Sequence, residues 1–223
     1  MWCIPPKQSG EFVAAMEDVL SVYKRRYNPR RPVVCFDETS KQLVAETRHP
    51  IAATPGKPRR IDYEYRRCGT ANIFMMFEPL ACWRHVKVTD QRTKVDFAYC
   101  VRELVDEWYP EASKIVLVLD NLNTHTLGSL YETFEPSEAF RIASKLEIHY
   151  TPKHGSWLNM AEIEIGVLSG QCIRRRIASI HQLSKEIASW EQSRNKTSRT
   201  VNWQFTTAKA RRKLKKLYPE ILS

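Results

Sequence analysis

The stretch of sequence that decides the fold is residues 115–120, IVLVLD, in which five aliphatic residues run directly into an aspartate. Residues 33–37, VVCFD, show the same pattern earlier in the chain. A short apolar run rich in β-branched residues is typical of a strand that is buried on both faces. We therefore predict two buried strands that each deliver a carboxylate, Asp37 or Asp120, to the tip of the strand.

Other elements are predicted around these two strands. Strands are expected at residues 71–79, 83–88 and 146–150, with a weak separate strand at 43–45. Helices are expected at residues 10–23, 93–110, 127–145, 158–177 and 207–217, and the second of these opens with a capping box from Thr93 to Asp96. Because strands alternate with helices after residue 90, we predict an α/β fold with a mixed five-stranded sheet flanked by helices.

The composition excludes several classes of protein. A chain of 223 residues with 43% hydrophobic and 27% charged residues is globular rather than disordered. No apolar run approaches the 18 or so residues of a membrane span, and residues 1–10 lack the pattern of a signal peptide, so we expect a cytoplasmic protein that does not enter a membrane. The net charge of +10 favours a polyanionic partner, nucleic acid before membrane.

The two strand-tip aspartates carry the functional prediction. Ligands of open α/β sheets bind beyond the carboxyl ends of the strands, so we expect Asp37 and Asp120 to be neighbours. Paired carboxylates repel each other unless they are protonated or bridged by a cation, and Mg²⁺ prefers carboxylate oxygens. Two such ions support phosphodiester chemistry. The alternative for either aspartate is a helix or turn cap.

A third acid is expected from the helix that follows residues 146–150. Glu162 and Glu164 lie two positions apart and therefore on nearly opposite faces of this helix. The apolar residues around it place Glu162 toward the sheet and Glu164 outward, so we choose Glu162. The alternative is a solvent-exposed helical glutamate.

Three fragments around these acids resemble the acidic motifs of DDE transposases. They are residues 36–39, FDET, residues 119–125, LDNLNTH, and residues 151–162, TPKHGSWLNMAE. The Asp120-Asn121 pair and the LNMAE element resemble the bacterial insertion-sequence branch of the mariner-like superfamily, as do residues 202–207 and 217–219.

The resemblance implies a ribonuclease-H-like core in which Asp37, Asp120 and Glu162 bind two Mg²⁺ or Mn²⁺ ions. It implies cleavage of double-stranded DNA at transposon ends, transfer of the freed 3′-hydroxyls to target DNA, commonly at TA, and a homodimer. Members of the family carry an N-terminal helix-turn-helix region, which the residues before Asp37 are not expected to accommodate. The expected alternatives are a truncated product, one frame of a split gene and a degenerate copy, and a split gene implies a separate N-terminal helix-turn-helix polypeptide as partner.

Basic and polar side chains outside the acids are the candidates for DNA contact. Residues 194–216 hold nine Lys or Arg and no acid, so phosphate binding is weighed there against an ordinary solvated helix face. The alternatives are a turn residue for Asn121, a helix-end histidine for His125 and packing for Trp157, while Glu38 is expected to face solvent or form a salt bridge. The predicted DNA-binding residues are Asn121, His125, Lys153, His154, Arg174, Arg175, Arg211, Arg212 and Lys215.

The chain is expected to divide into three parts. Residues 1–32 form an N-terminal helix and basic connector, residues 33–180 the DDE catalytic core, and residues 181–223 a C-terminal basic helical extension. Two alternatives to a transposase catalytic domain remain open, which are a ribonuclease-H-like nuclease without strand transfer and an inactive DNA-binding remnant.

Overall fold

A mixed sheet lies at the centre of the computed structural model, which describes residues 7–197, 201 and 203–220. Its five strands follow the order β3-β2-β1-β4-β5. The pairs β1–β2 and β2–β3 are antiparallel, whereas β1–β4 and β4–β5 are parallel. This arrangement confirms the predicted α/β class. The strands are β1 (Val33–Glu46), β2 (Tyr65–Glu78), β3 (Trp83–Thr89), β4 (Ile115–Leu119) and β5 (Leu146–Tyr150).

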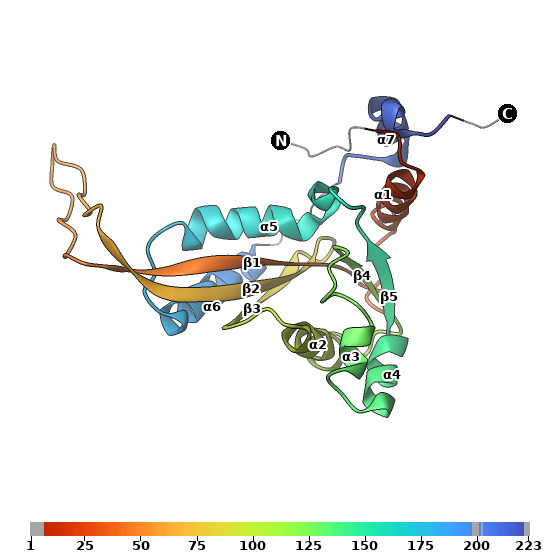
Figure 1. Cartoon of the computed structure of the whole chain (residues 1–223), viewed down its shortest axis with the longest axis horizontal. Coiled ribbons are helices and arrows are strands. Elements are labelled where there is room, and N and C mark those ends of the chain that lie inside the picture. The colour runs from red at the N-terminus through yellow and green to blue at the C-terminus, as the bar shows by residue number, and fades with distance from the viewer. Residues whose placement is uncertain (1–6, 198–200, 202, 221–223) are drawn as a thin grey trace.

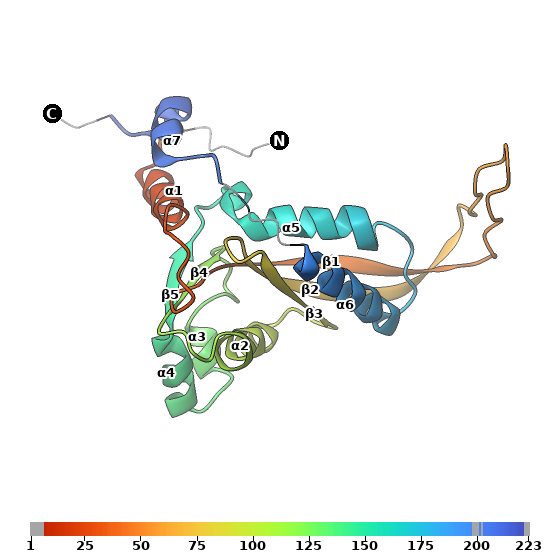
Figure 2. The ribbon, with the colours of Figure 1, turned by 180° about the vertical axis from the view of Figure 1, so that it is seen from behind.

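Helices cover both faces of the sheet (Figures 1 and 2). Side chains alternate between the faces along each strand, so that Cys35 and Val118 join one core while Phe36 and Leu119 join the other. The first core is covered by α1 (Gly10–Val22), α5 (Met160–Leu168), α6 (Ile180–Lys196) and α7 (Thr207–Lys213). The second is covered by α2 (Lys94–Glu103) with the π-helical turn Leu104–Trp108, α3 (Gly128–Tyr131) and α4 (Pro136–Ser144).

The predicted weak strand at residues 43–45 is the far half of β1, not a separate strand. Beyond Ser40 the strand pairs only with β2, and the two strands form an arm, residues 41–71, that projects away from the sheet (Figure 1). Residues 38–42 are polar and lack an apolar alternation in their sequence. They form a strand because they pair with β2. Asp37 therefore lies inside a long strand rather than at a strand tip.

Several predicted helix boundaries also change. The capping box at Thr93 is present as predicted, and Ser9 caps the start of α1. The predicted helix at 127–145 divides into α3 and α4, because Pro136 starts a new helix. Helix α5 ends at Leu168 and continues only as the π-helical turn Ser169–Ile173, which stops short of the predicted residue 177. The domain boundaries at residues 32 and 180 remain predictions.

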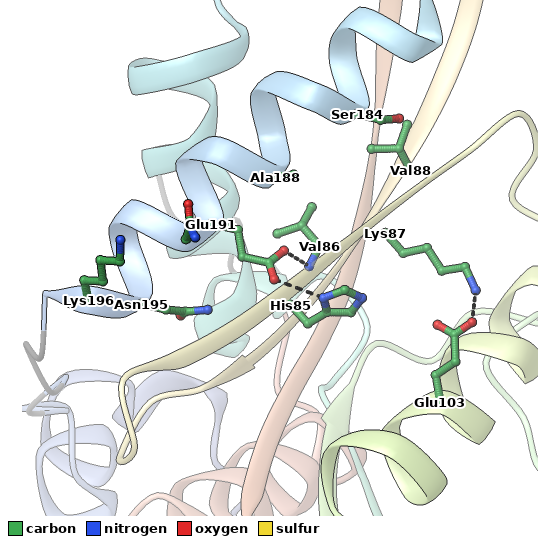
Figure 3. A pocket seen from close by; sticks show the side chains of 11 residues that line it. His85, Val86, Lys87, Val88, Glu103, Ser184, Ala188, Glu191, Asn195 and Lys196 are labelled. Carbon is green, nitrogen blue, oxygen red and sulfur yellow. Dashed lines mark hydrogen bonds and ion pairs between the residues drawn. The ribbon is translucent and has the colours of Figure 1, made fainter.

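Helix α6 was not predicted as a separate element, and it covers the edge strand β3. Glu191 Oε2 accepts a hydrogen bond from the Val86 backbone N–H at 2.8 Å (Figure 3). Asn195 accepts from the Arg84 backbone N–H at 3.0 Å and donates to the Arg84 carbonyl at 2.8 Å. Side chains of α6 thus satisfy backbone groups that an edge strand otherwise exposes to pairing with another chain.

Candidate active site

The parallel pairing of β1 and β4 brings two of the predicted acids to one place. Cys35 pairs with Val118, and two residues further along each segment the chain reaches Asp37 and Asp120. Asp120 directly follows β4, as predicted, because β4 ends at Leu119. The two acids thus lie at equivalent positions along the paired segments, Asp37 within β1 and Asp120 just beyond the end of β4.

Asp37 is the centre of a cluster of acids. Its side chain is largely buried, and its Oδ1 accepts a hydrogen bond from the Glu38 backbone N–H at 2.8 Å. Burial, followed by the negative charges of Asp120, Glu38 and Glu162, raises the pKa of Asp37 to about 7. The backbone hydrogen bond opposes this rise. Four carboxyl groups therefore lie near one another, and the other three disfavour the ionised form of Asp37.

Glu162 and Glu164 take the reverse of their predicted orientations. Glu162 is exposed, in the first turn of α5, and lines an open depression of about 630 Å³ together with Asp37 and Glu38. Glu164 is the buried one, at 3% exposure. The buried face of α5 contains this glutamate because two arginines neutralise it, with Arg84 Nε 3.1 Å and Arg194 Nε 2.9 Å from its Oε1. The prediction assumed that only apolar residues face the sheet.

Asn159 connects the helix that carries Glu162 to the strand that carries Asp37. It is completely buried and caps α5, its Oδ1 accepting from the Ala161 backbone N–H at 3.1 Å. Its Nδ2 donates to the Phe36 carbonyl at 2.8 Å and lies 3.4 Å from Asp37 Oδ2. The sequence prediction assigned Asn159 no role, although an asparagine just before a helix is an N-cap signal.

His125 is buried in this structure, whereas its predicted role is contact with DNA. Its ring is 1% exposed, with Nδ1 2.5 Å from Asp120 Oδ1 and Nε2 3.0 Å from Glu38 Oε2. Burial alone lowers the pKa of an imidazole, but hydrogen bonds to Asp120 and Glu38 raise the pKa of His125 to about 9. Two roles were predicted for Glu38, facing solvent or forming a salt bridge. The structure shows the second, because the Glu38 side chain is buried and forms an ion pair with His125.

Within the described residues, Glu38, Asp120 and His125 form the one group of three potential metal ligands whose ligand atoms all lie within 4.8 Å of one another. This group differs from the predicted set of Asp37, Asp120 and Glu162. Without a cation, the three side chains form a chain of two ion pairs, from Glu38 through His125 to Asp120.

The predicted DNA-binding residues fall into separate regions. Arg174 lines the depression with Asp37 and Glu162, whereas Arg175 is paired with Glu186. Helix α7 lies beside α1, at the end of the molecule away from the arm (Figure 1). There Arg211 is paired with Glu17 at 2.7 Å. The predicted DNA-binding residues that are exposed and appear in none of the described ion pairs are Asn121, Lys153, His154, Arg174, Arg212 and Lys215. Trp157 packs against Phe205, which agrees with the packing role given for it as an alternative to base stacking.

The structure thus has a five-stranded mixed sheet with acids on two adjacent parallel segments and on a following helix. The chain belongs to the DDE superfamily endonuclease family, whose sequence model matches residues 32–184. No curated protein sequence matches the chain significantly. No helix among the described residues is both long and apolar enough to cross a membrane.

Solved structures of the Mos1 mariner transposase share this fold. The Mos1 mariner paired end complex with Mn superposes with a TM-score of 0.58 at 15% identity, over 85% of this chain and 57% of that chain. The Mos1 strand transfer complex gives 0.57 at 15% identity, over 82% and 53%. The paired end complex with Mg gives 0.54 at 15% identity, over 85% and 57%. The predicted ribonuclease-H-like transposase fold is thus confirmed, and this chain spans little more than half of the Mos1 chain.

Proposed function

We propose that this chain is the catalytic domain of a transposase of the bacterial insertion-sequence branch, which cleaves DNA at transposon ends and joins the freed ends to target DNA. The observation that carries the proposal is the convergence of Asp120, Glu38 and Glu162 on the buried carboxyl of Asp37. Membership of the DDE endonuclease family supports it. The Mos1 structures of the same fold are paired end and strand transfer complexes, which supports the joining step.

Asp37, Asp120 and Glu162 are proposed to hold two Mg²⁺ or Mn²⁺ ions. The donor set fits, because carboxylate oxygens are the preferred ligands of these hard cations. The raised pKa of Asp37 fits too, since burial and unbalanced negative charge are what a bound cation would relieve. When bound, such ions supply activation of the attacking oxygen and stabilisation of the leaving oxygen.

The side chains of the chain itself supply the geometry. Asp37 is fixed by the Glu38 backbone and by Asn159, and Asp120 by His125. Glu162 is exposed on the depression, where a DNA phosphate is able to approach it. In the proposed cleavage step a water oxygen attacks phosphorus and the 3′-oxygen leaves. In the joining step that 3′-hydroxyl attacks a target phosphate and displaces the target 3′-oxygen, with no covalent bond to the protein.

Double-stranded DNA is the proposed partner, bound through basic residues on two surfaces. One surface is proposed to include Arg174, which lines the depression with the acids, together with the exposed residues Asn121, Lys153 and His154. The other is proposed on α7 and the turn that follows it, where Arg212 and Lys215 are exposed. Phosphate contacts of this kind fix position without reading sequence, and binding through them weakens steeply with salt. Binding of DNA by Arg175 and Arg211 would require them to leave Glu186 and Glu17.

A homodimer is proposed because two DNA ends must be brought together for joining. The arm supports it, since Ile51, Ile61 and Tyr63 near its tip are 66%, 55% and 84% exposed. Large apolar side chains gathered on a projecting hairpin are typical of a protein interaction surface. A separate helix-turn-helix polypeptide is proposed to recognise the transposon ends.

The proposal is tested with a supercoiled plasmid and with pre-cleaved oligonucleotide ends, both in Mn²⁺. The wild-type chain is expected to nick the plasmid and to join the ends to it, and Asp120→Asn to do neither. Asp106→Asn is the matched control, because Asp106 is a surface residue paired with Arg141. Nicking without joined products would indicate a nuclease without strand transfer. Salt-dependent DNA binding without nicking would indicate an inactive remnant, and equal nicking by Asp120→Asn would refute the site.

A further inference from the structure

One oxygen of Asp120 is already engaged by the protein. Its Oδ1 lies 2.5 Å from His125 Nδ1, within the short range of charge-assisted hydrogen bonds. The Asp120 side chain is 27% exposed, so it remains accessible from the open side. A carboxylate held through one oxygen presents the other in a fixed direction, whereas a free aspartate turns about its side-chain bonds.

His125 is held on every side, which makes it a rigid anchor for that oxygen. Its ring packs against Phe97 with centroids 4.8 Å apart and stands edge-on to Phe36 at 5.5 Å. Its backbone carbonyl accepts a hydrogen bond from the Tyr150 hydroxyl at 3.0 Å. Strand β5 and helix α2 therefore both fix the position of this histidine.

Glu38 supports the histidine from its other nitrogen. Glu38 Oε2 lies 3.0 Å from His125 Nε2, and the Glu38 side chain is only 5% exposed. Glu38 directly follows Asp37 in β1, so a continuous set of contacts runs from β1 through Glu38 and His125 to Asp120. Burying the charged side chains of Glu38 and His125 costs free energy unless each has a partner. Here they pair with each other.

We propose that His125 and Glu38 are positioning residues that hold Asp120 Oδ1 and leave Oδ2 available to a divalent cation. This inference rests on the proposed function, because it assumes that Asp120 binds the metal. Outer partners of metal ligands fix ligand orientation, and their removal typically weakens metal binding by about 10–100-fold.

The test measures Mn²⁺ affinity of the purified chain without DNA, from the electron paramagnetic resonance signal of free Mn²⁺. His125→Leu introduces an apolar side chain of similar size and loses both contacts, so Mn²⁺ affinity is expected to fall by about 10–100-fold. His125→Asn retains a donor near the position of Nδ1 and is expected to recover most of that affinity. Glu38→Ala is expected to weaken Mn²⁺ binding in the same direction.

His85→Leu is the matched control. His85 forms the same kind of pair, with its Nδ1 3.1 Å from Glu191 Oε1, but at the edge of β3 (Figure 3). Its removal is expected to alter stability and to leave Mn²⁺ affinity unchanged. A purely structural role for His125 predicts that the two histidine variants behave alike.

Asp120→Asn distinguishes failure of the proposed metal site from failure of the proposed positioning role. If this variant binds Mn²⁺ as tightly as the wild type, the proposed metal site itself fails. If it loses Mn²⁺ while folded His125→Leu keeps wild-type affinity, only the positioning role is overturned. Should His125→Leu not fold, judged by circular dichroism, Glu38→Ala decides, because wild-type affinity in that variant overturns the proposal.

Discussion

Asn159→Ala removes the side chain that joins α5 to β1, and its cost follows from two hydrogen bonds. Loss of the cap on the Ala161 N–H costs about 0.5–2 kcal/mol in other helices. The bond from Nδ2 to the Phe36 carbonyl is fully buried, so leaving its acceptor unsatisfied costs about 1–3 kcal/mol more. We expect the free energy of unfolding to fall by about 2–4 kcal/mol, since the two terms overlap within one side chain.

Urea unfolding followed by circular dichroism measures this change directly. Asn159→Ser keeps an acceptor for the cap but does not reach Phe36, so its stability is expected to lie between wild type and Asn159→Ala. Asn159→Asp keeps the cap and places a carboxylate near Asp37, where the Nδ2 atom lies 3.4 Å from Oδ2. It is expected to be destabilised most at neutral pH. A loss below about 0.5 kcal/mol for Asn159→Ala, the size of an ordinary surface substitution, would refute the reasoning.

Three further predictions use the same structure. The pKa of Asp37 is raised from 3.8 to about 7, so the folded chain holds a proton that the unfolded chain releases. Stability of the metal-free chain is therefore expected to fall as the pH rises from about 4 to about 7. Asp37→Asn should remove this fall and exceed wild-type stability at pH 8 in urea unfolding, and equal stability would contradict it. Glu164→Gln breaks a buried ion pair and should cost about 3–5 kcal/mol, whereas Glu162→Gln should leave thermal stability intact and abolish plasmid nicking. Arg212→Ala should reduce the slope of log DNA affinity against log salt by about one, and Arg211→Ala, already paired with Glu17, should reduce it less.

The sequence was most informative where burial follows directly from local composition. The runs before Asp37 and Asp120 are apolar on both faces, and strands of that kind lie at the centre of a sheet whatever surrounds them. Their parallel pairing then sets the two acids side by side. Cap signals such as Thr93 with Asp96 are also local, because donor and acceptor lie within one turn.

Features that depend on distant partners were predicted less well. Glu164 is buried because Arg84 and Arg194 neutralise it, and neither arginine is near it in sequence. His125 is buried because Phe36 and Phe97 enclose its ring, so the local pattern at the start of α3 gave no signal for it. The far half of β1 is a strand through its pairing with β2, and its own residues are mostly polar.

Helix α6 shows a related limit. Its apolar face, formed by Ile180, Leu183, Ile187 and Trp190 at helical spacing, packs against the first core, so this part of the helix was available to a periodicity argument and was missed. Its contact with the edge of β3 depends in addition on polar side chains, because Glu191 and Asn195 bind backbone groups there. Such contacts depend on the finished sheet and cannot be predicted from helical periodicity.

The most direct test of the account is the position of Mn²⁺ in crystals soaked with the ion, measured by anomalous diffraction. We expect anomalous density among the carboxylates of Asp37, Asp120 and Glu162, with His125 still bonded to Asp120. Density bound instead by His125 and Glu38, or none near Asp37, would contradict the proposed metal site.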